Sequence, residues 1–453
     1  LLVLSAGLAA ELVAASSRRP NVIFILADDL GWGDLSCYGN TFLRTPNLDR
    51  LAAGGSLFTS FYTSGPVCSP SRAGFCTGRY PARDRIHGHF ATRELNESRG
   101  MSSWLDPRAA NVAGAFRSAG YTTAHVGKWH LGNDAGGPAI ADYGFDFVGS
   151  GEGGGAGVRK DDPYYRARST ALFVDEALRF ISGRGERPFY LQLWALLPHA
   201  TLNPTPEQME PFLRLSNRDI AHPSARTLYY ASVADLDREI GRLLDRLAEL
   251  GLADDTIIVF SSDNGPETTA VVRMRADHGH DPARPWRGMK RDDWEGGHRV
   301  PLIVRWPART VPGVNDQTVC LTDLLATCAA LTGAKVPRDA GEDSFSFLPA
   351  LTGADDGRPR RTFTLHQTIK SDLAIRRGDW KYLDHRGSGG NNYDQGELAA
   401  FALPDIAPTA LGQLYDLRND PGERRNLALE RPEIARELKA LLDQSKASGR
   451  SAP

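Results

Sequence analysis

One short run, from Val67 to Arg79, places chemically capable residues at a fixed spacing. Starting at Cys68, it reads as the pattern C-x-P-S-R-x-x-x-x-T-G-R. Seven positions are fixed, so the chance of meeting this pattern at a given site is roughly 10⁻⁹ with average residue usage. A buried cysteine at a helix start would explain Pro70 and its serine neighbours, but not Arg72 or the closing Thr-Gly-Arg. The run therefore indicates a functional site.

Two pairs of oxygen-bearing side chains stand far apart in the sequence: Asp28 with Asp29, and Asp263 with Asn264. Hard cations such as Ca²⁺ and Mg²⁺ prefer all-oxygen ligand sets, whereas zinc sites take clustered cysteine and histidine, a spacing that the five cysteines do not show. Alone, two adjacent aspartates are more typical of a helix cap or a turn. Beside the second pair and the Cys68 run, they favour a metal site.

Three basic residues, Arg72, Lys128 and Lys290, are candidates to surround a tetrahedral anion, with the metal as a fourth positive pole. Such a ring stabilises the charge that builds on an ester oxygen as its bond breaks, provided that water is excluded. His130 and His199 are the natural proton carriers near neutral pH. Taken singly, each histidine is explained equally well as a structural residue bonded to backbone.

The four polar clusters outside the Cys68 run each follow a stretch that is predicted to be a buried strand. These strands are predicted at 21–27, 121–126, 187–195 and 256–260. They alternate with predicted helices at 46–54, 68–78, 109–119, 165–183, 224–250 and 322–332. Such alternation predicts an α/β fold with a mostly parallel sheet sandwiched by helices, in which ligands bind at the carboxyl ends of the strands.

The last part of the chain has a different pattern. Short strands are predicted at 363–367, 373–376, 381–384 and 413–417, and a helix at 432–445. This pattern predicts a smaller antiparallel α+β subdomain, joined through a linker near 353–361 that is rich in Gly, Asp and Arg. We therefore expect a signal-peptide remnant at 1–17, a catalytic domain at 18–352 and a C-terminal subdomain at 362–453.

Composition limits the partners. The chain has 453 residues, 41% of them hydrophobic, and a formal net charge of −2. Such a chain builds a large core and has no overall charge that would attract nucleic acid or an anionic membrane. The apolar run near the N-terminus is too short to span a bilayer and is typical of a secretory signal, so we expect a periplasmic or secreted protein without stable membrane insertion.

The Cys68 run resembles the signature of the type I sulfatases, in which the cysteine is oxidised after translation to Cα-formylglycine. Further blocks are similar to those of the family and occur in family order: 21–39, 127–132, 198–199, 262–266, 287–301, 379–381 and 414–423. The resemblance runs from about Arg19 to the end of the chain. It implies the fold of the alkaline-phosphatase superfamily and a maturation enzyme that generates formylglycine as a partner.

Position by position, the resemblance implies one Ca²⁺ per chain. Its ligands are implied to be Asp28, Asp29, Asp263, Asn264 and the modified Cys68.

The resemblance also implies roles in catalysis. One hydroxyl of the hydrated aldehyde attacks sulfur, with His199 and Lys290 assisting the leaving oxygen. His130 then takes a proton from the second hydroxyl, which expels sulfate and restores the aldehyde. Arg72 is implied to orient the formylglycine, and Lys128 to bind the sulfate.

We expect the substrate to be a sulfate monoester, on a carbohydrate rather than a small aryl group. Trp104, Arg93, the loop at 151–157 and an insert containing His278 and His280 are expected to shape the sugar pocket. Two other functions stay open: hydrolysis of a phosphonate or phosphate ester with the same nucleophile and metal, and a non-catalytic calcium- or glycan-binding role.

Two positions depart from the family pattern. His298 stands where Glu-Gly-Gly-x-Arg commonly has an apolar residue, and Ser150 is an unsafe match to a family serine.

Overall fold

The computed structural model describes residues 19–132, 136–151, 161–215, 223–278, 280–307, 309–354 and 358–452. The expected signal-peptide remnant at 1–17 and part of the expected linker lie outside the described residues. Across the described ranges, no helix is both long and apolar enough to cross a membrane.

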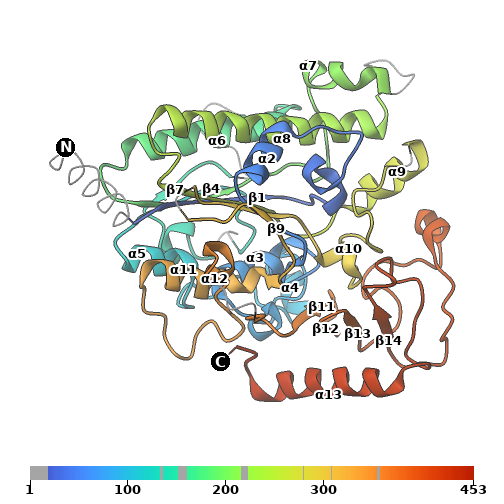
Figure 1. The fold of residues 1–453 in the computed structure, drawn as a ribbon. Helices are drawn as coiled ribbons and strands as arrows, with labels where there is room; N and C mark the ends of the chain where they lie inside the picture. Colours follow the sequence, from blue (N-terminus) through green and yellow to red (C-terminus); the bar gives the residue numbers. More distant parts are fainter. Residues whose placement is uncertain are drawn as a thin grey trace, which may run out of the picture.

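A central sheet runs through the molecule (Figure 1). Its strands are, in spatial order, β5 (Phe147–Val148), β4 (Thr122–Gly127), β6 (Phe189–Trp194), β1 (Asn21–Ala27), β7 (Thr256–Ser262), β8 (Leu302–Arg305), β2 (Ser56–Phe58) and β9 (Gly313–Asn315). All neighbours from β5 to β7 are parallel, β8 is antiparallel to both of its neighbours, and β9 is parallel to β2. The predicted mostly parallel sheet is confirmed.

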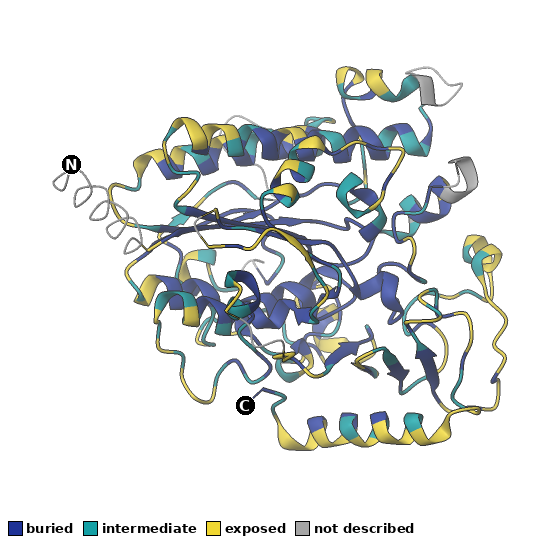
Figure 2. Ribbon diagram, in the orientation of Figure 1, coloured by how far each residue is buried: buried dark blue, intermediate teal, exposed yellow. Residues whose placement is uncertain are grey.

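Helices cover both faces of this sheet (Figure 1). One layer contains α2 (Pro46–Ala53), α6 (Tyr165–Gly183) and α8 (Ala225–Glu249), and the other contains α3 (Cys68–Thr77), α5 (Val112–Ser118), α11 (Leu324–Thr332) and α12 (Leu348–Thr352). Alternate residues of β1 serve the two layers: Phe24 belongs to the core on the α3 side and Ile25 to the core on the α8 side. Figure 2 shows the central strands of the sheet buried, and β9 at its edge and the outer faces of α6 and α8 exposed.

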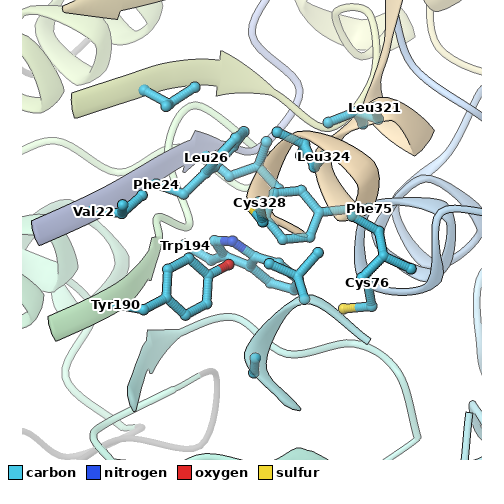
Figure 3. Close-up of a cluster of buried hydrophobic side chains, with 14 of the residues drawn as sticks. Val22, Phe24, Leu26, Phe75, Cys76, Tyr190, Trp194, Leu321, Leu324 and Cys328 are labelled. Atoms are coloured by element: carbon cyan, nitrogen blue, oxygen red, sulfur yellow. The ribbon is translucent and has the colours of Figure 1, made fainter. Parts of the chain in front are cut away.

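The core on the α3 side fixes the position of that helix. Figure 3 shows Phe24 of β1, Phe75 of α3 and Trp194 of β6 packed together. The rings of Phe24 and Phe75 are 4.5 Å apart, and those of Phe75 and Trp194 are 5.1 Å apart, both edge to face. A helix anchored by such aromatic contacts holds its first residue, Cys68, in a defined place above the sheet.

The C-terminal part forms a separate antiparallel sheet, as predicted. Its strands are β11 (Thr364–Gln367), β12 (Leu373–Arg377), β13 (Trp380–Leu383) and β14 (Gln413–Asp416), and helix α13 (Pro432–Ser448) follows them. Leu438 and Leu442 of α13 are buried against this sheet. The sheet lies beside helix α10 (Glu295–His298) (Figure 1), while the domain boundaries at 352 and 362 stay a prediction.

Three further segments contain short elements. Residues 56–62 include two short strands, β2 and β3 (Phe61–Tyr62), which join different sheets. The insert that contains His278 and His280 begins within helix α9 (Thr268–His278). Cys320 lies in β10 (Val319–Cys320) and Cys328 on α11.

The remaining short helices lie in connections. They are α4 (Arg93–Ser98), α7 (Pro206–Met209) and α10 (Glu295–His298).

Candidate active site

The four predicted polar clusters meet at one edge of the central sheet. Strands β4, β6, β1 and β7 are neighbours and run parallel, so their carboxyl ends lie together. Lys128 and His130 follow β4, His199 follows β6, the Asp28–Asp29 pair follows β1, and Asp263 with Asn264 follows β7. The predicted convergence is therefore confirmed by the topology.

Cys68 enters this edge from the α3 layer. It is the first residue of α3, and Val67 before it is extended, with φ −148° and ψ 166°. The thiol is buried, and its sulfur lies 3.5 Å from Asp28 Oδ1 and 3.5 Å from Lys128 Nζ. The positive end of the helix dipole points at the same place, which favours negative charge there.

Arg72 lies one turn further along α3 and is fully buried. Its Nε and Nη2 donate to Asp263 Oδ2 at 3.0 and 2.7 Å, and its Nη1 donates to the carbonyl of Lys128 at 2.9 Å. The guanidinium also lies 4.9 Å from the ring centroid of Trp194. Arg72 thus ties together α3, the end of β7 and the end of β4.

Two lysines contact the aspartate pair. Lys128 Nζ lies 2.7 Å from Asp28 Oδ2, and Lys290 Nζ lies 2.7 Å from Asp29 Oδ1. Lys290 Nζ is also 3.4 Å from Glu267 Oε2. Both ammonium groups are almost completely buried, so their attraction to the carboxylates is little screened by water.

The charges at this edge shift one another's pKa values. Burial alone raises the pKa of Asp28, but neighbouring positive charges, Lys128 foremost, outweigh it and hold that pKa well below its usual range. Burial alone lowers the pKa of Lys290, but Asp29 outweighs burial and raises it well above its usual range. Burial raises the pKa of the Cys68 thiol, which keeps this group protonated.

The two histidines are placed differently. Burial, with Lys128 and Arg72 adding to it, lowers the pKa of His130 well below its usual range, so this ring is neutral near pH 7. His130 Nε2 lies 3.4 Å from the carbonyl of Phe90. His199 keeps 26% of its side chain exposed, and its Nε2 lies 3.7 Å from Asp29 Oδ2.

The oxygen-rich end of β1 and β7 fits a hard cation. The Nδ2 of Asn264 donates to Asp29 Oδ1 at 2.7 Å, while its Oδ1 is buried without a hydrogen-bond partner among the described residues. A buried amide oxygen left in this way is costly unless another group binds it. Ligand atoms of Asp28, Asp29, Cys68 and His199 lie within 4.8 Å of one another. Carboxylate and amide oxygens are what Ca²⁺ or Mg²⁺ requires.

Backbone geometry at the strand ends supports the same assignment. Asp29 and His130 have positive φ angles, 65° and 54°, which are uncommon for residues with side chains and gather at functional sites. Gly127, just before Lys128, has φ 109°, and a Cβ there would lie 1.9 Å from the carbonyl oxygen of Trp194. Only glycine therefore fits where β4 passes into the Lys128 segment.

Sequence reasoning missed two residues that hold Lys290. Glu267 contacts its ammonium group, and Asn391 Nδ2 donates to its backbone carbonyl at 2.8 Å. Glu267 directly follows the Asn264-Gly265-Pro266 segment, so its position in the sequence could have identified it as a residue of the site. Asn391 lies about 100 residues further on, and nothing in its local sequence connects it with the site.

Ser150, the unsafe family match, donates to Glu176 Oε1 at 2.7 Å, and its carbonyl accepts from the backbone N–H of Gly127 at 2.7 Å. One expectation about the surroundings needs correction. His280 is buried, with its Nε2 3.3 Å from Asp34 Oδ1, so it is no exposed substrate contact. The side chain of His278 and most of the loop at 151–157 lie outside the described residues.

Comparison with known proteins agrees with this geometry. The family model described as Sulfatase matches residues 20–334. The chain is 31% identical to an N-acetylgalactosamine-6-O-sulfatase of Bacteroides thetaiotaomicron, over 95% of this chain and 94% of that protein. It is 32% identical to arylsulfatase A of Homo sapiens, over 97% of this chain and 89% of that protein.

The fold is also similar to that of a solved structure. It comes from Bacteroides thetaiotaomicron and is described in connection with the metabolism of multiple glycosaminoglycans. The TM-score is 0.78 at 29% sequence identity, with 95% of this chain and 100% of that chain covered.

Proposed function

Because this chain belongs to the sulfatase family and is a sulfuric ester hydrolase, we propose that it hydrolyses a sulfate monoester of a carbohydrate, using formylglycine made from Cys68 and one bound Ca²⁺. The observation that carries the proposal is the contact of Cys68 with both Asp28 and Lys128 at the sheet edge. Residue 68 therefore lies next to a proposed metal ligand and a proposed anion-binding cation, which themselves form an ion pair.

We propose that the metal ligands are Asp28, Asp29, Asp263, Asn264 and the modified Cys68. When bound, the ion would supply positive charge next to a sulfate oxygen and the nucleophile. The unpartnered Oδ1 of Asn264 supports this set, because it supplies a neutral oxygen beside the three carboxylates.

The environment of Cys68 favours an aldehyde hydrate over a thiol as the working group. Burial raises the pKa of the thiol, and the thiolate is the form of cysteine that reacts and binds metals. A hydrate offers hard oxygen atoms at the same position, next to Asp28 and Lys128. The conversion requires a formylglycine-generating enzyme as a partner. We expect the mature protein, which carries the formylglycine, to be periplasmic or secreted.

We assign roles in sulfate binding or catalysis to three cationic side chains. Lys128, which contacts Cys68, is proposed to bind the sulfate, while Lys290, which contacts Asp29, is proposed to assist the leaving oxygen. Arg72 is held by Asp263 and by backbone, which suits a group that orients residue 68 rather than one that moves. Fixed cations in a buried site stabilise developing charge without reorganising.

Two histidines are assigned to proton transfer. His130 is the proposed base at residue 68, because its lowered pKa keeps the ring able to accept a proton at neutral pH. His199 is the proposed proton donor to the leaving oxygen, because it is partly exposed and lies beside Asp29.

A groove next to His199 has room for a sugar. It has a volume of about 420 Å³ and is lined by Pro198, Thr201, Tyr229, Glu267 and Arg273 among others. Most of the lining is apolar, and Thr201, Glu267 and the exposed guanidinium of Arg273 are the groups that would meet a polyhydroxylated or acidic substrate. The similarity to an N-acetylgalactosamine-6-O-sulfatase supports the same choice.

The proposal is tested with protein coexpressed with a formylglycine-generating enzyme and assayed with Ca²⁺. The substrates are N-acetylgalactosamine 6-sulfate, 4-nitrophenyl sulfate and a phosphonate monoester of 4-nitrophenol. We expect sulfate release from the sugar with a higher kcat/KM than from the aryl sulfate. Turnover of the aryl sulfate alone would contradict the carbohydrate assignment, and faster turnover of the phosphonate would favour the alternative ester class.

A further inference from the structure

A second group of metal-ligating side chains lies where the segment after Lys290 meets the C-terminal sheet. Asp293 precedes helix α10, His298 ends it, and His366 lies on β11. All three side chains are fully buried. One ligand atom from each of the three lies within 4.8 Å of the others.

His298 presents a lone pair toward Asp293. Its Nδ1 lies 3.3 Å from the carbonyl oxygen of Thr63, which can only accept, so Nδ1 carries a proton. In the neutral ring, Nε2 is then an acceptor. This Nε2 lies 3.1 Å from Asp293 Oδ1, yet neither atom has a hydrogen-bond partner within the described residues. Two lone pairs at this distance repel each other unless a cation lies between them.

The ring nitrogens of His366 are less well satisfied than those of His298. Both of its ring nitrogens are buried without a hydrogen-bond partner in the described part of the chain. The ring centroids of His298 and Tyr62 lie 4.7 and 4.9 Å from that of His366. Each unpartnered buried nitrogen costs about 1–3 kcal/mol. A second proton on His298 would give Asp293 a hydrogen-bond donor but would leave both ring nitrogens of His366 without a partner. One ion bound by all three side chains would give each of them a partner.

The donor set identifies the kind of ion. Two imidazole nitrogens and one carboxylate oxygen suit a zinc-type divalent ion, while Ca²⁺ prefers oxygen alone. The 3.1 Å between His298 Nε2 and Asp293 Oδ1 is close to the edge of about 3.3 Å expected for tetrahedral zinc. The other oxygen of Asp293 accepts from His385 Nε2 at 3.0 Å, the kind of support that ligating carboxylates receive.

The neighbouring charges are compatible with a bound cation. Lys381 is the cation that lowers the pKa of His366 most, and its ammonium lies 3.0 Å from Glu295 and 3.4 Å from Glu423. Its charge is therefore offset by two carboxylates. Burial, with Lys381 adding to it, lowers the pKa of His366 well below its usual range, and the neutral ring is the form that binds metal.

We propose that Asp293, His298 and His366 bind one zinc-type divalent transition ion in a buried, structural site. The ion would join the segment that carries Lys290 to strand β11 of the C-terminal sheet. Its ligands are distinct from the Ca²⁺ ligands proposed at the sheet edge. Its role is to hold the Lys290 segment against the second sheet.

The test uses full-length, tag-free protein from cells grown with Zn²⁺, purified in excess Ca²⁺ and analysed by elemental mass spectrometry. Two variants are compared with the wild type: His366→Phe, which removes a proposed ligand, and Asp263→Asn, which alters only the sheet-edge cluster. Asp293→Asn serves as a second ligand variant if His366→Phe does not fold. Protein grown with Co²⁺ instead is examined for the visible absorption of a four-coordinate site.

We expect about one zinc per chain in the wild type and in Asp263→Asn, with binding weakened about 100-fold in His366→Phe. The cobalt band should be lost in the same ligand variant. Equal zinc content in wild type and His366→Phe would overturn the proposal. So would zinc lost only in Asp263→Asn, since it would place the ion at the sheet edge. Neither readout depends on sulfate ester turnover.

Discussion

At the scale of single residues, the sheet edge pairs every buried charge with an opposite one. Arg72 is bound to Asp263, Lys128 to Asp28 and Lys290 to Asp29. Each broken pair would leave an uncompensated buried charge, which is costly in a low-dielectric interior. The amide oxygen of Asn264 is the exception among these atoms, because it has no partner in the described residues.

The role of Asn264 leads to a prediction on metal affinity. Asn264→Ala removes one oxygen ligand and leaves the three aspartates in place. We expect Ca²⁺ to bind about 10- to 100-fold more weakly, as measured by calorimetry on chelator-treated protein. Asn315→Ala, in the edge strand β9, is the matched control and should bind Ca²⁺ like the wild type. Equal affinity in both variants would remove Asn264 from the ligand set.

A second residue, His125, links stability to pH. It is buried in β4, its Nδ1 lies 3.1 Å from Gln192 Oε1, and burial lowers its pKa to about 4. The unfolded chain takes up a proton near pH 6.5 while the folded ring stays neutral, so stability is lost as pH falls from 6.5 to 4.

The variant His125→Asn should remove this contribution. Between pH 6.5 and 4.5 its free energy of unfolding should fall less than that of the wild type, by about 1–3 kcal/mol, in urea titrations at each pH. Around pH 8, the free energy of unfolding should depend on pH to the same extent in the two proteins. The same pH dependence in both proteins would contradict the assignment.

At the scale of elements, the ends of four parallel strands and the start of α3 determine the site. The chain turns sharply at the ends of β1 and β4, as the positive φ angles of Asp29, Gly127 and His130 show. Helix α3 ends at Gly78, whose φ of 67° is the left-handed conformation that closes helices. Side-chain positions at the site therefore depend on backbone that only a few residue types allow.

Gly127→Ala tests this dependence. The added Cβ would meet the carbonyl oxygen of Trp194, so β4 must shift and move Lys128. We expect a loss of about 2–4 kcal/mol in the free energy of unfolding and reduced turnover. The matched control is Gly183→Ala at the end of α6, where no atom lies within 4 Å and φ is not positive. This change should be neutral or stabilising by up to about 1 kcal/mol, and a similar loss in both would count against local crowding.

At the scale of the whole molecule, the C-terminal sheet supports the catalytic edge. Asn391 holds the Lys290 carbonyl, and Trp294 Nε1 donates to Gln413 Oε1 at 3.2 Å. Lys381 of β13 is fully buried and contacts Glu295 of α10. The two sheets are therefore connected by buried polar contacts as well as by apolar packing.

Lys381→Met tests that connection. It leaves the carboxylates of Glu295 and Glu423 buried without their shared cation, so we expect a loss of about 3–5 kcal/mol in the free energy of unfolding. Lys439→Met on α13 is the control, because its ammonium pairs with Asp384 at 3.0 Å but is 42% exposed. That change should cost less than about 1 kcal/mol, and equal effects would show that the buried contact does not join the sheets.

Much of this architecture was predictable because the signals are local. The buried strands are continuous apolar runs, and polar residues directly follow each one, so the convergence at 28, 128, 199 and 263 could be inferred from the sequence. Contacts made across long separations could not. The positions of Asn391 and His366 depend on how the second sheet docks, and the burial of His280 depends on its pairing with Asp34.

The central claim is that Cys68 works as formylglycine. The most direct measurement is the mass of the tryptic peptide containing residue 68, taken on fractions whose rate of sulfate release is also measured. We predict that turnover per chain rises in proportion to the fraction carrying an aldehyde at position 68, and that Cys68→Ala folds but releases no sulfate. Full turnover by protein whose residue 68 is entirely unmodified cysteine would contradict the account.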